Sequence, residues 1–472
     1  MLRAAAASCL WASSQAREAG SLLPVGVGAL SAAEEANRTI FVWDHTNMDL
    51  GNATEAYRAL FADDQVPLDM LVEDHDFAEF EMARDAKRVL ETKMPESLAA
   101  SADEADVVLV ALWPYGLCML NVSGHSVGMA DWQTQKGILA AGSCPEIQAA
   151  YTKIVKSDRF AVADGRDFAF IADKVTKMLE DWSPGWAYKQ LVNRSVLVGV
   201  EERRLTAELG SSRHLPVPYY VDPEKWYLES NGSATALRKD NFAAYWGSKH
   251  VGEHCPACSG SNDPKDVRDG IIDQLVKGCE SDSRQCKIIV NDDSSDRNTF
   301  LDDADLTFEM DMQNSVFCPV PRGDSAATKR FYCALAALCI PVVVSDHFPF
   351  PYANTVDYSS FVIRYSESDV ASRSVDVYRE LSTVDPLRIR QMQEAMESAR
   401  HDLLYTRNGS WPAWHKGRAV INVVDELRRL PVCHQSSVPA DGTSERCDRN
   451  VVGGTFEGCI SCKPKLELMP PQ

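Results

Sequence analysis

The sequence of 472 residues predicts an α/β protein made of two Rossmann-like domains in succession. Continuous apolar runs at residues 106–113 and 340–345 are typical of parallel strands that are buried on both faces. Segments with helical periodicity alternate with such runs. The pattern restarts after Pro216 and Pro218, which predict an extended linker. Two such domains enclose a cleft, and ligands bind at the carboxyl ends of parallel strands.

In the first half, β-branched and aromatic runs alternate with amphipathic segments. Strands are predicted at residues 39–43, 106–113, 160–163 and 196–200, and helices at residues 64–93 and 147–155. In the second half, strands are predicted at residues 242–246, 287–290, 315–319, 340–345 and 361–365. Helices are predicted there at residues 263–277, 325–338, 387–404 and 411–430. The predicted units are residues 37–213 and 214–430, preceded by a targeting or disordered segment at 1–36 and followed by a Cys-rich tail at 431–472.

The overall charge restricts the class of partner. Lys and Arg number 48 and Asp and Glu number 68, so the net charge is −20. This balance argues against a protein whose main partner is nucleic acid or an anionic membrane. A local basic pocket for a small anion stays compatible with it. No apolar run reaches the ~18 residues of a membrane-spanning helix, so none is predicted.

Glycosylation sequons and cysteines predict a compartment. Acceptor motifs occur at Asn37, Asn52, Asn121, Asn193, Asn231 and Asn408. The chain has 14 cysteines. Those in polar, loop-like surroundings, including Cys279 and Cys286, are expected to form disulfides, whereas Cys318, Cys333 and Cys339 are interpreted as small core residues. We therefore expect a protein of the secretory pathway lumen.

Most of the candidate functional residues lie in one segment of the second half, residues 315–346. A predicted strand is followed by a Pro-Arg-Gly-Asp-Ser loop and a helix that we expect to begin near Ser325 as N-cap. Gly323 allows the backbone to approach a ligand closely, and the amides of the first turn suit an anion such as a diphosphate. Arg330 lies one turn further along and can reach such a charge. A plain strand–loop–helix is the alternative interpretation.

The same segment resembles the signature of the exostosin-type inverting glycosyltransferases of family 47. The matching residues are Ser315, Phe317, Cys318, Pro321, Gly323, Asp324, Ser325, Arg330, Cys339, Ile340, Pro341, Val342, Val343, Asp346 and Phe350. Weaker matches in the same order extend the resemblance over roughly residues 38–430. The resemblance implies a GT-B fold, with the acceptor glycan on the first domain and a nucleotide-sugar donor, a UDP-sugar, on the second. It also implies that no metal or other cofactor is required, a Golgi location, and a homodimer or a heterodimer with another exostosin-like transferase.

By the same resemblance, Arg268 and Arg330 bind the donor diphosphate. The other expected donor-binding residues are Arg238, Gly323, Asp324, Ser325 and Lys329. An inverting displacement also needs a base for the acceptor hydroxyl. Asp44, His45 and Asp167 are the candidates, because each is predicted to follow a strand.

One departure from the family pattern leaves a second function open. Family members usually carry an acid three residues after the helix arginine, where this chain has Cys333. A catalytically inactive glycan-binding or scaffold protein on the same fold, partnering an active transferase, is therefore the alternative. A nicotinamide oxidoreductase is disfavoured, because no strand is followed by a Gly-x-Gly-x-x-Gly motif.

Overall fold

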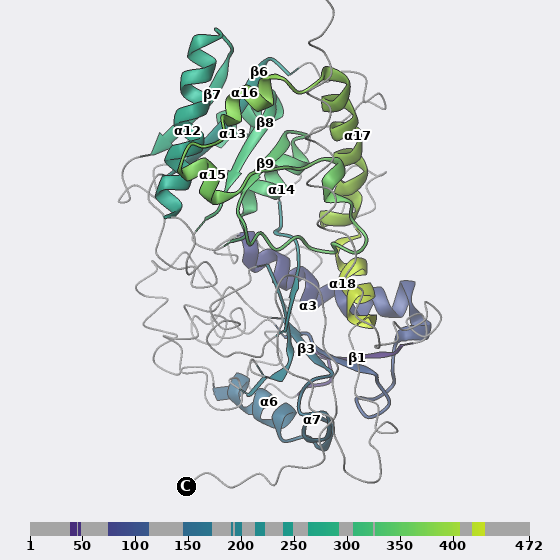
Figure 1. Ribbon diagram of the computed structural model, residues 1–472. Coiled ribbons are helices and arrows are strands. Elements are labelled where there is room, and N and C mark those ends of the chain that lie inside the picture. The colour runs from purple at the N-terminus through teal and green to yellow at the C-terminus, as the bar shows by residue number, and fades with distance from the viewer. Residues whose placement is uncertain are drawn as a thin grey trace, which may run out of the picture.

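The computed structural model describes residues 38–44, 46–48, 74–112, 145–171, 190–191, 194–200, 213–221, 239–248, 263–291, 305–323, 326–405 and 418–429. These residues form two five-stranded parallel sheets, one in each half of the chain (Figure 1). In the first sheet the strands lie side by side in chain order. They are β1 (Ile40–Trp43), β2 (Val107–Val110), β3 (Phe168–Ile171), β4 (Val196–Gly199) and β5 (Arg213–Pro216).

The second sheet has the order β10-β9-β8-β6-β7. Its strands are β6 (Asn241–Ser248), β7 (Cys286–Asn291), β8 (Ser315–Pro321), β9 (Ile340–Val344) and β10 (Ile363–Arg364). The chain moves from β6 outward to β7, then returns to place β8 on the other side of β6. The strand order therefore reverses between β6 and β8. In open parallel sheets such a reversal opens a crevice at the carboxyl ends of the two strands.

Helices connect the strands of each sheet. The first half has α3 (Asp74–Lys93), the short 3-10 helix η4 (Pro95–Ser97), α6 (Pro145–Val155) and α7 (Asp158–Ala163). The second half has α12 (Pro264–Ser281), α13 (Asp305–Gln313), α14 (Lys329–Ala336), η6 (Tyr358–Ser360), α15 (Glu367–Ala371), α16 (Val377–Ser382), α17 (Pro386–Leu403) and α18 (Ala419–Arg428).

The core explains why these segments take these forms. Every residue of β2 and of β9 is buried, as expected for central parallel strands of Val, Ile and Leu. In α14 all residues from Phe331 to Ala336 are buried, and the Thr328 side chain caps the helix by accepting from the Arg330 amide. A disulfide between Cys318 of β8 and Cys339, just before β9, joins the two strands through the core.

Several contacts join the two halves. After β5 the chain turns toward the second sheet, where the Tyr219 ring lies 5.9 Å from the ring of Tyr332 in α14. The hydroxyl of Tyr405 donates to the carbonyl of Pro218 at 3.0 Å. In the other direction, α18 packs against α3, and both helices lie between the two sheets in Figure 1. Arg38, which precedes β1, donates to the carbonyl of Arg428 at the end of α18.

The predicted α/β architecture with two Rossmann-like parallel sheets is confirmed, and four local predictions are wrong. Residues 160–163 belong to helix α7, and the strand begins at Phe168. The expected linker at Pro216 is strand β5, so the first sheet extends beyond residue 213. Helix α14 begins at Lys329 with Thr328 as its cap, rather than at Ser325. Cys318 and Cys339 form a disulfide, whereas the expected disulfide bonding of Cys279 and Cys286 is confirmed, since these two pair with each other.

Several predictions lie outside the described residues. They concern His45, Asp324, Ser325, Arg238 and all the sequons, which are Asn37, Asn52, Asn121, Asn193, Asn231 and Asn408. The segments 1–36 and 431–472 also lie outside them. Within the described part of the chain, no helix is both long and apolar enough to cross a membrane.

Candidate functional site

At the reversal, the carboxyl ends of the neighbouring strands β6 and β8 lie side by side. β6 ends with Trp246, Gly247 and Ser248, and β8 is followed by Arg322 and Gly323. Two positively charged side chains from neighbouring helices lie there, Arg268 from α12 and Arg330 from the first turn of α14, which begins with Lys329. We call this set of segments and cations the switch-point site.

Arg330 is held against the end of β6 by three features. Its Nη2 donates to the carbonyl of Trp246. Its guanidinium lies over the Tyr245 ring, 4.6 Å from the ring centroid, which is within cation–π range. Gly247 leaves room for it, because a Cβ there would come within 2.7 Å of Nη2. The Arg330 guanidinium is therefore placed at the switch point by the strand itself.

Arg268 is held in the same way against the end of β8. It lies in the second turn of α12, and its Nε and Nη2 donate to the carbonyl of Arg322 at 3.2 and 3.1 Å. Its side chain is buried although it carries a charge. The two arginines predicted to act together thus rest on the strand ends on either side of the reversal. Such a pair of cations, near the amides of a helix start, suits a diphosphate.

A buried ion pair lies beside the two arginines and was not predicted from the sequence. Arg322 Nε lies 3.0 Å from Oε2 of Glu367, the first residue of α15, and the side chains are 4% and 0% exposed. Oε1 of Glu367 accepts from the Asp346 amide, and the Glu367 amide donates to the Asp346 carboxylate, each at 3.1 Å. Burial raises the pKa of the Glu367 carboxyl, while the Asp346 amide and the Arg322 guanidinium lower it in part. Glu367 thus matches the charge of Arg322.

Among the base candidates, Asp44 directly follows β1, at the carboxyl end of the first sheet. The carboxylate is buried, and its Oδ1 accepts from the amide and hydroxyl of Thr46 at 2.9 and 2.5 Å. Its Oδ2 lies 3.5 Å from Nζ of Lys87 in α3. Asp44 thus follows a strand, as predicted, and Thr46 and Lys87 hold its carboxylate in place.

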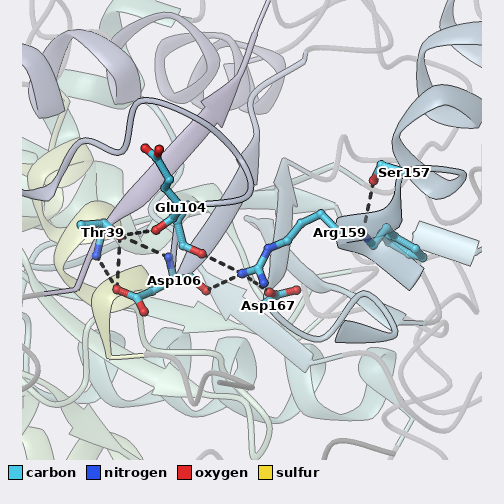
Figure 2. Close-up of polar contacts among 8 residues, drawn as sticks. Thr39, Glu104, Asp106, Ser157, Arg159 and Asp167 are labelled. Atoms are coloured by element: carbon cyan, nitrogen blue, oxygen red, sulfur yellow. Dashed lines mark hydrogen bonds and ion pairs between the residues drawn. The ribbon is translucent and has the colours of Figure 1, made fainter. Parts of the chain in front are cut away.

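Asp167 lies at the opposite end of that sheet. It precedes β3 rather than following a strand, because the segment before it is helix α7. Figure 2 shows its carboxylate paired with the buried guanidinium of Arg159, which also donates to the carbonyl of Ala105. Nearby, Asp106 accepts from the amide and hydroxyl of Thr39. These contacts join the amino ends of β1, β2 and β3, so the structure gives Asp167 a place in a buried structural network.

The departure from the family pattern, Cys333, lies in α14 one turn after Arg330 and is 3% exposed. It is outside both described disulfides. Among the described residues, no group of three or more His, Cys, Asp or Glu side chains is arranged to hold a metal ion.

Comparison with known proteins adds the family. An exostosin-1 homolog of Caenorhabditis elegans is 41% identical over 61 residues, which cover 13% of this chain and 16% of that protein. A probable xyloglucan galactosyltransferase of Arabidopsis thaliana is 26% identical over 309 residues, 63% of this chain and 56% of that protein. The chain thus spans about half or less of the curated relatives it matches. Among solved structures, S. aureus TarM with bound UDP aligns weakly, at 7% identity and a TM-score of 0.28 over 60% of this chain and 58% of that one.

The sequence model of the Exostosin GT47 domain matches residues 78–381, which include most of α3, both arginines of the switch-point site and the ion pair of Arg322 with Glu367. With the motif at residues 315–346 and the two parallel sheets that carry it, this match shows that the chain belongs to the exostosin GT47 family.

Proposed function

We propose that the protein is an inverting glycosyltransferase that moves a sugar from a UDP-sugar to a glycan acceptor. One observation supports the proposal above the others: Arg268 and Arg330 come from different helices and rest on the strand ends at either side of the β6–β8 reversal. A parallel sheet binds ligands at such a place. The printed names of the relatives, which include a galactosyltransferase and an arabinosyltransferase, agree with sugar transfer.

In this proposal the acceptor hydroxyl oxygen attacks the anomeric carbon of the donor, and the bond from that carbon to the diphosphate oxygen breaks. Negative charge grows on the leaving UDP. Arg330 and Arg268 stabilise that charge, with Lys329 and the amides of the α14 start adding to the positive potential. The acceptor proton goes to a base on the first domain, for which Asp44 has the best placed carboxylate. We propose that these cations serve in place of a metal ion.

The test is the substitution Arg330→Ala, assayed by calorimetric titration with UDP. Loss of one charge-assisted contact to the diphosphate is expected to weaken UDP binding by roughly 10- to 100-fold, since such contacts contribute about 1.5–3 kcal/mol. Arg373→Ala is the matched control, because Arg373 also forms a charged contact, but with Asp273 on the exposed surface and outside the switch-point site. Unchanged UDP affinity in Arg330→Ala, or an equal loss in Arg373→Ala, would contradict the proposed donor site.

The alternative function, a glycan-binding or scaffold protein without turnover, rests on the buried Cys333 at the position of the family acid. It shares the fold and the UDP site but not the chemistry. Release of UDP from a panel of UDP-sugars, with and without glycan acceptors, separates the two: acceptor-dependent release supports the transferase, and UDP binding without release supports the scaffold.

We also infer a luminal setting. Two described disulfides, Cys279–Cys286 and Cys318–Cys339, are typical of proteins that fold in an oxidising compartment. Within the secretory pathway, the Golgi is the compartment that fits a transferase acting on glycans. A homodimer, or a heterodimer with another exostosin-like transferase, is the assembly we propose.

A further inference from the structure

We propose that Glu367 is a positioning residue for the switch-point site: by holding Arg322 it fixes the backbone carbonyl on which Arg268 rests. The inference depends on the proposed function only for what the site binds. Glu367 itself belongs to α15, beyond the motif that identifies the family, and it touches neither Arg268 nor Arg330 in any contact described above.

The contacts form a continuous chain across the ends of three strands. Glu367 lies just after β10 and holds both the Asp346 amide after β9 and the Arg322 guanidinium after β8. The Arg322 amide donates to the Val344 carbonyl at 3.1 Å, and its own carbonyl accepts twice from Arg268. A change at Glu367 is therefore two contacts away from the Arg268 guanidinium.

Burial makes this chain sensitive to loss of the carboxylate. Arg322 and Glu367 are 3% and 0% exposed, so water does not replace a lost partner. Removal of one partner from a buried ion pair is costly, and we expect the backbone that carries Arg322 to shift in response. Because Gly323 directly follows Arg322, such a shift also moves the backbone that we expect to approach the donor.

Glu367→Gln is the informative substitution, because it keeps the size of the side chain and one oxygen for the Asp346 amide. Its amide group presents a donor, instead of a charged acceptor, to Arg322. Glu394→Gln on the exposed face of α17 is the matched control. Two measurements are made on the full chain: calorimetric titration with UDP between pH 5 and pH 8, and amide hydrogen exchange of the segment around residues 319–327 without nucleotide.

We expect Glu367→Gln to weaken UDP binding about tenfold at pH 8, a change worth about 1.4 kcal/mol, while Glu394→Gln leaves it unchanged. Burial raises the pKa of Glu367, so the wild-type carboxylate gains its proton at a higher pH than an ordinary glutamate does. The difference between wild type and Glu367→Gln should therefore shrink toward low pH. Asp346, His347 and Arg322 face this carboxylate, and all three are present in both proteins.

Hydrogen exchange separates this inference from the proposed function. Faster exchange of the β8–α14 segment in Glu367→Gln, with β3 and β4 unchanged, supports the positioning role even if UDP does not bind the wild type. Equal exchange and equal UDP affinity in the two proteins would overturn it. A uniform rise in exchange over the whole chain would also overturn it, because it would indicate a general loss of stability.

Discussion

At the scale of single residues, the position of Arg330 depends on the absence of a side chain at its neighbour. Gly247 has no positive φ, so its backbone would accept alanine. The space is the constraint, since an added Cβ would lie 2.7 Å from both Arg330 Nη2 and the Tyr245 hydroxyl. Tyr245 is fully buried, whereas the arginine end is a flexible tip. Both the arginine tip and the Tyr245 ring must therefore move.

Gly247→Ala is expected to displace Arg330 from the Trp246 carbonyl and to weaken UDP binding nearly as much as Arg330→Ala does. The free energy of unfolding should also fall, by about 1–3 kcal/mol, because the buried Tyr245 ring must shift to make room for the added Cβ. Titration of the single variants and the double variant with UDP checks this. In the Arg330→Ala background, Gly247→Ala should have little further effect, and additive losses would contradict the shared mechanism.

The sequence predicted the residues of this site unequally. Arg330 and Gly323 stand in a dense motif, and Arg268 entered only through the family resemblance. Tyr245 and Gly247 gave no separate signal, because their role appears only when α14 is packed against β6. Glu367 could not have been found, since nothing in the chain links it to Arg322 before β8, β9 and β10 are aligned. Asp167 was placed after a strand because a short apolar run at residues 160–163 fits a helix and a strand equally well.

At the scale of elements, the central strands were predictable and the helix packing was not. Continuous Val and Ile runs mark β2 and β9, because strands buried on both faces need no polar positions. By contrast, α12 contains Gly270 and Gly278 in its interior, where glycine is unfavourable. The structure gives the reason: a Cβ at Gly270 would lie 2.4 Å from the Val370 carbonyl oxygen of α15, and one at Gly278 would lie 2.1 Å from the Tyr378 ring of α16. Both glycines permit close packing of a neighbouring helix.

Gly278→Ala is therefore expected to destabilise the protein, although alanine is the better helix former by about 1 kcal/mol. The Tyr378 ring cannot withdraw freely, because its hydroxyl donates to Asp282 at 2.9 Å and its ring lies 5.1 Å from that of Phe242. Overpacking of this kind costs about 1–3 kcal/mol or more, so the net change should be a loss. Denaturant unfolding measures it. Lys277→Ala, at an exposed position one residue earlier, should be nearly neutral, and a stabilised Gly278→Ala would contradict the packing argument.

At the scale of the whole molecule, two connections among the described residues join the sheets, and neither could be recognised from the sequence. The first is the segment after β5, where the prolines that predicted a linker in fact end a strand, as is possible at the margin of a sheet. The second is α18, which returns from the second half to α3. Tyr352 holds the start of α18 through the Ala419 carbonyl, and Arg38 holds its end. Such contacts join residues 67 and 390 positions apart, a distance over which the chain's periodicity carries no information.

Buried ionisable groups are expected to make the free energy of unfolding rise with pH over one range (the rising limb) and fall over a higher range (the falling limb). Two residues before β6, Nζ of Lys239 donates to the carbonyls of Gln313 and Ala337, at the ends of α13 and α14. Burial and then the nearby Arg400 guanidinium lower the pKa of Lys239 to about 7. In the unfolded chain lysine keeps its proton to about pH 10.4, so between these values the unfolded state binds more protons. Stability should therefore rise as the pH increases from about 7 toward 10.

Tyrosines reverse the trend at higher pH. Burial raises the pKa of Tyr352 and Tyr358, so these side chains stay neutral in the folded protein while the unfolded chain ionises near pH 10. Their contribution is complete below that pH and is lost above it. Thermal unfolding followed from pH 7 to pH 11 should show a maximum between the two limbs. Lys239→Met removes the group that causes the rising limb, whose slope reaches about 1.4 kcal/mol per pH unit, and should leave the falling limb in place. The exposed Lys277→Met should preserve both limbs, and a rising limb that survives in Lys239→Met would show that another buried group releases the proton.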